Sequence, residues 1–126
     1  MYELKVKTHF DAAHQLVGYE GRCCQLHGHR WEVEVALSGT RLDKQNILVD
    51  FGVIKKWMER TYEDLFDHHF LNETLKTDCP TAEFIAKWLS EAITDYVKCN
   101  LKYIEVESVT VWESPDCSVK YADTGE

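Results

Sequence analysis

Two stretches of the chain alternate apolar and polar side chains, and this alternation constrains the fold more than any other feature. Residues 2–13 have one largely apolar face and one charged or polar face, and residues 27–39 repeat the pattern. Successive side chains of a β-strand project from opposite faces, so both stretches are predicted to be half-buried strands. The apolar face of the first comprises Tyr2, Leu4, Val6, Thr8, Phe10 and Ala12. Residues 14–26 contain Gly18 and Gly21 and are predicted to form a loop.

Two helical patterns follow the second predicted strand. Asp50 precedes apolar residues at helical spacing and is predicted to be an N-cap. Pro80 is predicted to open the second helix, because its missing N–H does no harm in a first turn. The second helix has one broad apolar stripe, formed by Phe84, Ile85, Trp88, Leu89, Ala92, Ile93 and Tyr96.

The C-terminal part of the chain returns to β character. Residues 102–113 are predicted to be a strand, residues 114–116 a turn and residues 117–121 a short last strand. The order ββααββ predicts one α+β domain over residues 1–126, an antiparallel sheet with both helices on one face. Such a sheet has open edges, which often pair with neighbouring subunits, so an oligomer is expected.

Charge and composition limit the classes of partner and compartment. The 126 residues carry a formal charge of −8, from 22 acidic and 14 basic residues, which disfavours nucleic acid but leaves a small anionic substrate open. No apolar run approaches the roughly 20 residues of a membrane helix, and the N-terminus does not resemble a signal peptide. The five cysteines show no disulfide-framework spacing, so free thiols in the cytoplasm are expected.

The strongest chemical signal is the segment His27-Gly28-His29. Two residues apart on a strand, both imidazoles project from the same face and can reach one ion, and Gly28 leaves room for close backbone approach. His14 is in phase with Phe10 and lies at the same end of a hairpin of the first two strands. An HxH pair alone is more often a pair of ordinary strand residues. The third histidine favours a catalytic zinc site with an open fourth position.

Cys23 and Cys24 lie just upstream of the histidine pair. A thiol here could be a fourth zinc ligand, which would make the site structural. It could instead be a base, because a nearby cation lowers a thiol pKa, or a buried bystander. Spacing alone leaves these roles open, and it does not choose between the two cysteines.

Acidic residues and a further histidine form the remaining candidates. Asp67 precedes His68 and could hold its imidazole in one tautomer, although a surface polar cluster would look the same. Glu113 is in phase with the apolar residues of its strand, so it is expected to point inward, where a ligand with two N–H donors would suit it. Glu83 lies in the first turn of a predicted helix, where capping is its ordinary role.

Five segments occur together in one order: FDAAHQL, CCQLHGH, FDHHFLN, CPTAEFIAKWL and VTVWES. In this combination the chain resembles the 6-pyruvoyltetrahydropterin synthase superfamily over nearly its whole length. Within that superfamily it is most similar to the 6-carboxytetrahydropterin synthases of bacterial queuosine biosynthesis, which also have a cysteine four residues before the first histidine of HGH.

The resemblance implies a role for each candidate residue. It implies one Zn²⁺ per subunit, bound by His14, His27 and His29, and Cys23 as the proton acceptor. The adjoining Cys24 could exchange roles with Cys23. The remaining implied residues are His68 as a proton relay supported by Asp67, Glu113 as the holder of the pterin amino-pyrimidine edge and part of the relay, and Glu83 with Thr81 as further pterin contacts.

The resemblance also implies an assembly and a reaction. The fold would be the tunnelling fold, a ββααββ unit that forms barrel-shaped trimers and, from two trimers, a homohexamer with active sites between subunits. The reaction would convert 7,8-dihydroneopterin triphosphate and water to 6-carboxytetrahydropterin, acetaldehyde and triphosphate. The alternatives are the pyruvoyl-forming elimination of triphosphate from the same substrate and a non-catalytic, zinc-stabilised oligomer that binds pterins.

Overall fold

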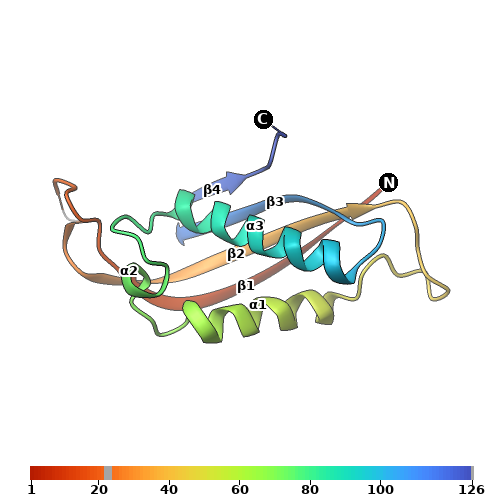
Figure 1. Ribbon diagram of the computed structural model, residues 1–126, viewed down its shortest axis with the longest axis horizontal. Coiled ribbons are helices and arrows are strands. Elements are labelled where there is room, and N and C mark those ends of the chain that lie inside the picture. The colour runs from red at the N-terminus through yellow and green to blue at the C-terminus, as the bar shows by residue number, and fades with distance from the viewer. Residues whose placement is uncertain (22–23, 126) are drawn as a thin grey trace.

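The computed structural model describes residues 1–21 and 24–125 of the chain (Figure 1). Its elements, in chain order, are β1 (Tyr2–His14), β2 (His27–Gly39), α1 (Phe51–Leu65), α2 (Leu71–Thr74), α3 (Ala82–Asn100), β3 (Glu105–Ser114) and β4 (Cys117–Tyr121). The four strands and the two long helices confirm the predicted ββααββ order. The short helix α2, which has 4 residues, was not predicted because so few residues show no helical period.

The strands form one antiparallel sheet in the order β1-β2-β3-β4, so β1 and β4 are its edges. The ladder between β1 and β2 begins with Tyr2 opposite Gly39 and ends with His14 opposite His27. Directly opposed residues of antiparallel strands share a face, so the two apolar faces combine into one. In this ladder Phe10 opposes Trp31, and their rings stack with a centroid distance of 6.2 Å.

Both long helices cover the same face of the sheet, as predicted (Figure 1). Helix α1 packs on β1, and α3 packs on β3 and β4. The layer between them contains the hydrophobic core, whose largest fully buried apolar members are Trp31, Phe10, Phe66, Leu37, Ile54, Met58, Leu71, Ile85, Leu89 and Ile93. The opposite face is polar and carries ion pairs such as Lys7–Glu32 at 2.9 Å. None of the helices in the described part of the chain combines the length and apolar character needed to cross a bilayer.

The predicted start of α1 is confirmed, whereas the predicted start of β3 is too early. Asp50 is the N-cap of α1, as predicted, because its Oδ1 atom accepts a hydrogen bond from the N–H of Gly52 at 2.8 Å. The strand predicted over residues 102–113 begins later, at Glu105. Tyr103 has a φ of 63°, a left-handed conformation that a strand does not tolerate.

The prediction that Pro80 opens the second helix is wrong by two residues. Helix α3 begins at Ala82, and Thr81 is its N-cap. The Oγ1 atom of Thr81 accepts a hydrogen bond from the N–H of Phe84 at 3.1 Å, which satisfies one of the free N–H groups of the first turn. Pro80 therefore precedes the cap, and its carbonyl group is free for another partner.

Candidate active site

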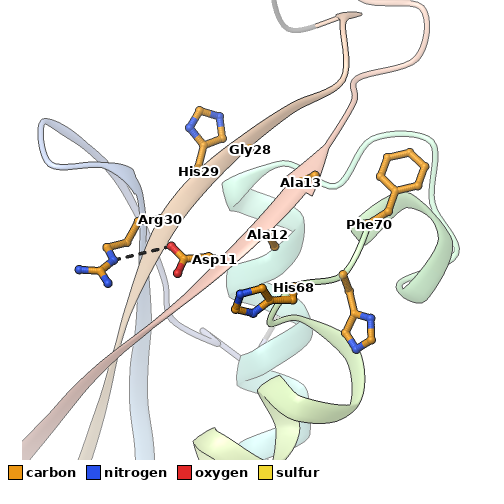
Figure 2. A pocket seen from close by; sticks show the side chains of 9 residues that line it. Asp11, Ala12, Ala13, Gly28, His29, Arg30, His68 and Phe70 are labelled. Atoms are coloured by element: carbon orange, nitrogen blue, oxygen red, sulfur yellow. Dashed lines mark ion pairs between the residues drawn. The ribbon is translucent and has the colours of Figure 1, made fainter.

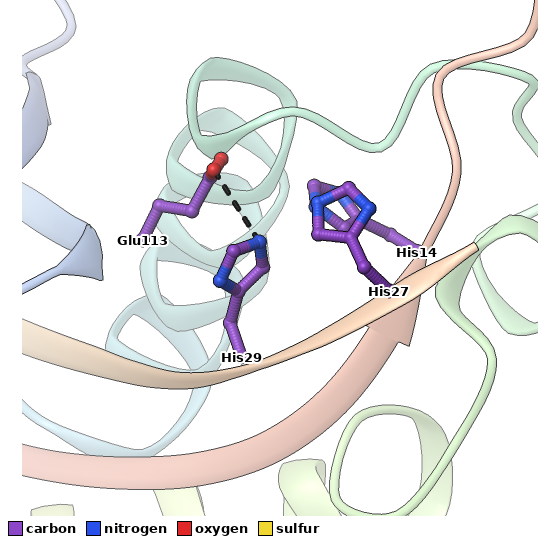
Figure 3. Close-up of side chains that lie close together, drawn as sticks. All are labelled: His14, His27, His29 and Glu113. Carbon is purple, nitrogen blue, oxygen red and sulfur yellow. Dashed lines mark hydrogen bonds and ion pairs between the residues drawn. The ribbon is translucent and has the colours of Figure 1, made fainter. Parts of the chain in front are cut away.

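Three imidazoles and one carboxylate meet at the end of the β1–β2 ladder (Figure 3). His14 is the last residue of β1, His27 is the first residue of β2, and His29 follows on the same face. Glu113 reaches the group from β3. One possible ligand atom of each residue lies within 4.8 Å of the others. The structure therefore brings together the three histidines that the sequence analysis placed at one hairpin end.

Backbone carbonyl groups determine the tautomers of two of these rings. The Nδ1 atom of His14 lies 2.9 Å from the carbonyl oxygen of Pro80, and Nδ1 of His27 lies 2.7 Å from that of Gln25. A carbonyl oxygen only accepts, so each Nδ1 must carry the proton of a neutral ring. The Nε2 atom of each ring is then a bare acceptor. An imidazole fixed in this way by its second nitrogen is the usual arrangement of a metal ligand.

The bare Nε2 atoms face one another, which fits a bound cation. Those of His14 and His27 are 3.0 Å apart, a separation at which two lone pairs repel. The Nε2 atom of His29 is buried and has no hydrogen-bond partner among the described residues. A tetrahedral zinc ion with Zn–N distances of about 2.0–2.1 Å would separate two bound nitrogens by roughly 3.3 Å. The donor set and its spacing therefore fit a zinc ion, and the group could hold a metal.

Burial keeps two of the imidazoles neutral. It lowers the pKa of His14, and the hydrogen bond to Pro80 and the charge of Glu113 oppose this shift. Burial likewise lowers the pKa of His29, against the opposing charge of Glu113. Only a neutral imidazole can bind a metal, so the lowered pKa values keep these donors available at neutral pH.

Glu113 reaches the histidines from an irregular point in the sheet. The register between β3 and β4 shifts between Trp112 and Ser114, so Glu113 lies in a β-bulge. Bulges redirect side chains and are common next to active sites. The Oε1 atom of Glu113 lies 3.5 Å from Nε2 of His29, and its side chain is 32% exposed. The carboxylate can therefore reach either a metal ion held by the imidazoles or a ligand bound beside it.

The predicted contact between Asp67 and His68 is present, but the pair lies outside the group formed by the three histidines and Glu113. The Oδ2 atom of Asp67 lies 2.9 Å from Nδ1 of His68, whose side chain is 79% exposed. The other carboxylate oxygen of Asp67 accepts a hydrogen bond from the N–H of Asp11 at 3.0 Å, and this bond chiefly lowers the pKa of Asp67. Among the described residues, the cluster of possible metal donors does not include His68.

His68 borders a cavity of about 530 Å³ that is also lined by residues of β1 and β2, including His29 (Figure 2). Asp11, Gly28 and Arg30 line the same cavity. Asp11 and Arg30 form an ion pair there, with Oδ1 and Nε 3.7 Å apart. Because neighbouring residues of a strand project from opposite faces, Arg30 points away from the side on which His29 meets the other histidines.

The remaining predicted residues are spread around this region. Cys23 lies outside the described residues. Cys24 is half-buried, and its carbonyl oxygen accepts a hydrogen bond from Nε2 of Gln15 at 2.8 Å. Glu83 lies in the first turn of α3, as predicted, and is exposed there. Thr81 is the N-cap of the same helix, a role that was not predicted.

The expectation that Gly28 allows a close backbone approach is wrong within this chain. A Cβ atom added to Gly28 would meet its nearest neighbour, the carbonyl oxygen of Ala12, at 3.8 Å, an ordinary contact. The sequence also gave no indication that the carbonyl groups of Pro80 and Gln25 would orient the imidazoles. Every residue carries a carbonyl, so residue type holds no signal for such a role.

Comparison with known proteins gives one consistent result. A family model described as 6-pyruvoyl tetrahydropterin synthase matches residues 3–124. A 6-carboxy-5,6,7,8-tetrahydropterin synthase from Synechocystis sp. is 34% identical over 101 residues, which cover 77% of this chain and 78% of that protein. The protein of the same name from Haemophilus influenzae is 27% identical over 141 residues, covering 98% of this chain and 100% of that protein.

Solved structures share the fold. The 6-pyruvoyl tetrahydropterin synthase of Caenorhabditis elegans has a TM-score of 0.82 at 24% identity, with 98% of this chain and 96% of that chain covered. An uncharacterized protein from Wolinella succinogenes has a TM-score of 0.80 at 19% identity, with 97% of this chain and 98% of that chain covered. By the match that spans residues 3–124, this chain belongs to the 6-pyruvoyl tetrahydropterin synthase family.

Proposed function

We propose that this chain is a zinc-dependent 6-carboxy-5,6,7,8-tetrahydropterin synthase. It would convert 7,8-dihydroneopterin triphosphate and water to 6-carboxytetrahydropterin, acetaldehyde and triphosphate, a step of queuosine biosynthesis in the cytoplasm. The observation that carries the proposal is the group of three imidazoles whose donor atoms face one another. Family membership and curated relatives named for this activity at 27% and 34% identity support it.

The metal would be held by the Nε2 atoms of His14 and His27 and by His29. A bound zinc ion would lower the pKa of the hydroxyl groups on the substrate side chain. Glu113, beside His29, is suited to the amino-pyrimidine edge of the pterin, because a carboxylate can accept two parallel N–H hydrogen bonds. Glu83 and Thr81 would provide further contacts to the pterin.

Proton transfer would require groups that are not metal ligands. Cys23 would remove a proton from the substrate side chain. His68 would carry protons during the internal rearrangement that reduces the ring while it shortens the side chain. Asp67 orients this imidazole, because it accepts from Nδ1 and leaves Nε2 free for the transfer.

The site would be completed by a neighbouring subunit of a hexamer built from two trimers. Two observations support this assembly: β1 and β4 are edge strands, and His68 is 79% exposed on the outer side of β1. Edges of a sheet readily pair with another chain, which would bring His68 of one subunit toward the metal group of the next.

The proposal is tested by product analysis after incubation of the zinc-loaded protein with 7,8-dihydroneopterin triphosphate. Mass spectrometry should detect 6-carboxytetrahydropterin, and acetaldehyde should appear in equal amount. A product that keeps its three-carbon side chain, without acetaldehyde, would identify the pyruvoyl-forming reaction instead. Absence of turnover in a protein that still shows a pterin-induced thermal shift would favour the non-catalytic, zinc-stabilised oligomer that binds pterins.

A further inference from the structure

Asn72 joins two segments of the chain beside the metal group. Its Oδ1 atom accepts a hydrogen bond from the N–H of Gln15 at 3.0 Å, and its Nδ2 atom donates to the carbonyl oxygen of Gln15 at 2.7 Å. Nδ2 also lies 3.3 Å from the carbonyl oxygen of Asp78. Asn72 thus links the residue after His14 to the segment that leads to Pro80, whose carbonyl orients His14.

Gln15 continues the connection to the other side of the hairpin. The β1–β2 ladder ends at the pair His14–His27, and no ladder joins the two segments beyond it among the residues that the structure describes. There the Nε2 atom of Gln15 donates to the carbonyl oxygen of Cys24 at 2.8 Å. The next residue, Gln25, provides the carbonyl oxygen that accepts from Nδ1 of His27.

We infer that Asn72 and Gln15 form an amide clamp that positions the two carbonyl groups orienting His14 and His27. One end of the clamp fixes the segment that carries Pro80, and the other fixes the segment that carries Gln25. Among the described residues, the side-chain hydrogen bonds of Asn72 and Gln15 go to backbone groups and not to the metal donors, so both residues are positioning residues. The inference rests on the metal site of the proposed function and assigns a role to the asparagine of the FDHHFLN segment.

Amide chemistry is required at both positions. Asn72 must accept from one backbone N–H and donate to carbonyl oxygens, which a carboxylate cannot do. Gln15 must donate to the carbonyl oxygen of Cys24. The substitutions Asn72→Asp and Gln15→Glu keep the shape of each side chain but set a negative charge against carbonyl oxygens. Each should displace the segment it holds without removing a metal ligand.

The test measures zinc affinity by competition with a chromophoric chelator, together with the tautomers of the metal-free imidazoles by ¹⁵N–¹H correlation spectra. Asn100→Asp and Gln45→Glu are matched controls that make the same chemical change at exposed positions. The amide of Asn100 donates to the carbonyl oxygen of Tyr96, away from the site. Circular dichroism identifies the variants that fold.

Asn72→Asp and Gln15→Glu should each weaken zinc binding by about 10-fold, as expected for residues that support metal ligands. Without metal, His14 should lose its uniform Nδ1–H tautomer in Asn72→Asp, and His27 should lose its own in Gln15→Glu. Both controls should keep the zinc affinity and the tautomers of the wild type. A folded Gln15→Glu or Asn72→Asp protein with wild-type zinc affinity and wild-type tautomers would overturn the clamp alone. A wild-type protein that takes up no zinc would overturn the proposed function as well.

Discussion

The Oε1 atom of Glu113 lies 3.5 Å from Nε2 of His29, so a metal ion or ligand atom beside His29 would be within reach of both groups. This contact permits two roles for Glu113. As a metal donor it would complete four-coordination and close the site, whereas as a ligand holder it would leave the fourth position of the metal open for substrate. The three imidazoles supply enough donors for a catalytic zinc ion, so we expect the second role.

Glu113→Gln should therefore weaken pterin binding and leave zinc in place. Loss of a charged hydrogen-bond acceptor costs about 1.5–3 kcal/mol, which corresponds to roughly a 10- to 100-fold rise in the Kd of the pterin. Pterin fluorescence measures the affinity, and plasma mass spectrometry measures the zinc content. A variant that binds pterin normally but loses zinc would show that Glu113 is a metal ligand.

Zinc should stabilise the folded protein through His14. At a free zinc concentration of about 100 times Kd, binding contributes about 2.7 kcal/mol. For a chain of this size the melting temperature should rise by roughly 10 °C. His14→Ala should abolish the zinc-dependent rise, whatever its effect on the metal-free protein. His9→Ala, at an exposed position on the other face of β1, should keep the full rise in the same calorimetric scans. An equal rise in the His14→Ala protein would contradict the assignment.

The alternation of apolar and polar residues predicted the group of three histidines because the β1–β2 pairing cannot shift by one residue without exposing the core. Phe10 and Trp31 are buried on the same face as the imidazoles, and a slip of either strand would expose them. The register that buries these rings also sets His14 against His27. Local alternation and core burial together therefore determine this part of the site.

Residues outside the ladder could not be located in the same way. His68 follows α1 in a turn and has a φ of 59°, a conformation held by contacts with β1, such as the hydrogen bond from its N–H to Asp11 at 2.6 Å. The direction of its side chain follows from that packing and not from any period in the sequence. The amides of Asn72 and Gln15 likewise acquire their role only when distant segments meet.

Asp67 should contribute to stability at neutral pH but not in acid. Its pKa is lowered mainly by the N–H of Asp11, so the unfolded state takes up a proton at a higher pH than the folded state does. The contribution is therefore fully present above the usual carboxyl value and is lost as the pH falls through the lowered one. Urea unfolding from about pH 5 to about pH 2 should show the stability difference between wild type and Asp67→Asn shrinking. The exposed control Asp64→Asn should show no such trend, and a difference that stays constant for Asp67→Asn would contradict the argument.

Gly39 should be far less tolerant of a side chain than Gly28. A Cβ atom on Gly39 would lie 2.8 Å from Cδ1 of Leu48 and 2.9 Å from the carbonyl oxygen of Tyr103. Overpacking of this kind costs about 1–3 kcal/mol, so Gly39→Ala should lower the free energy of unfolding by that amount. Gly28→Ala, with its nearest contact at 3.8 Å, should change it by less than about 0.5 kcal/mol. Denaturant unfolding of the metal-free proteins measures both, and equal losses would refute the packing argument.

Cys23 and His68 should act in one active site from two different subunits. The Cys23→Ala and His68→Ala proteins should each convert the substrate very slowly. Both should retain zinc, because neither residue is a metal ligand in the proposed site. If the two groups come from different subunits, hexamers with equal numbers of the two variant chains contain about one quarter of sites with both residues intact. Coexpression of the two variants should therefore restore about a quarter of the wild-type rate of acetaldehyde release, relative to the same amount of oligomer.

The adjoining thiol provides the control for this experiment. Cys24→Ala alone should remain active, since the half-buried Cys24 is held through its carbonyl oxygen and not its sulfur. An inactive Cys24→Ala protein beside an active Cys23→Ala protein would exchange the roles of the two cysteines. No gain in activity on coexpression, when each variant is folded, oligomeric and zinc-loaded, would place the thiol and His68 in the same subunit. The exposed position of His68 on the outer side of β1 would then need another explanation, because among the described residues of one chain His68 is not part of the group of possible metal donors.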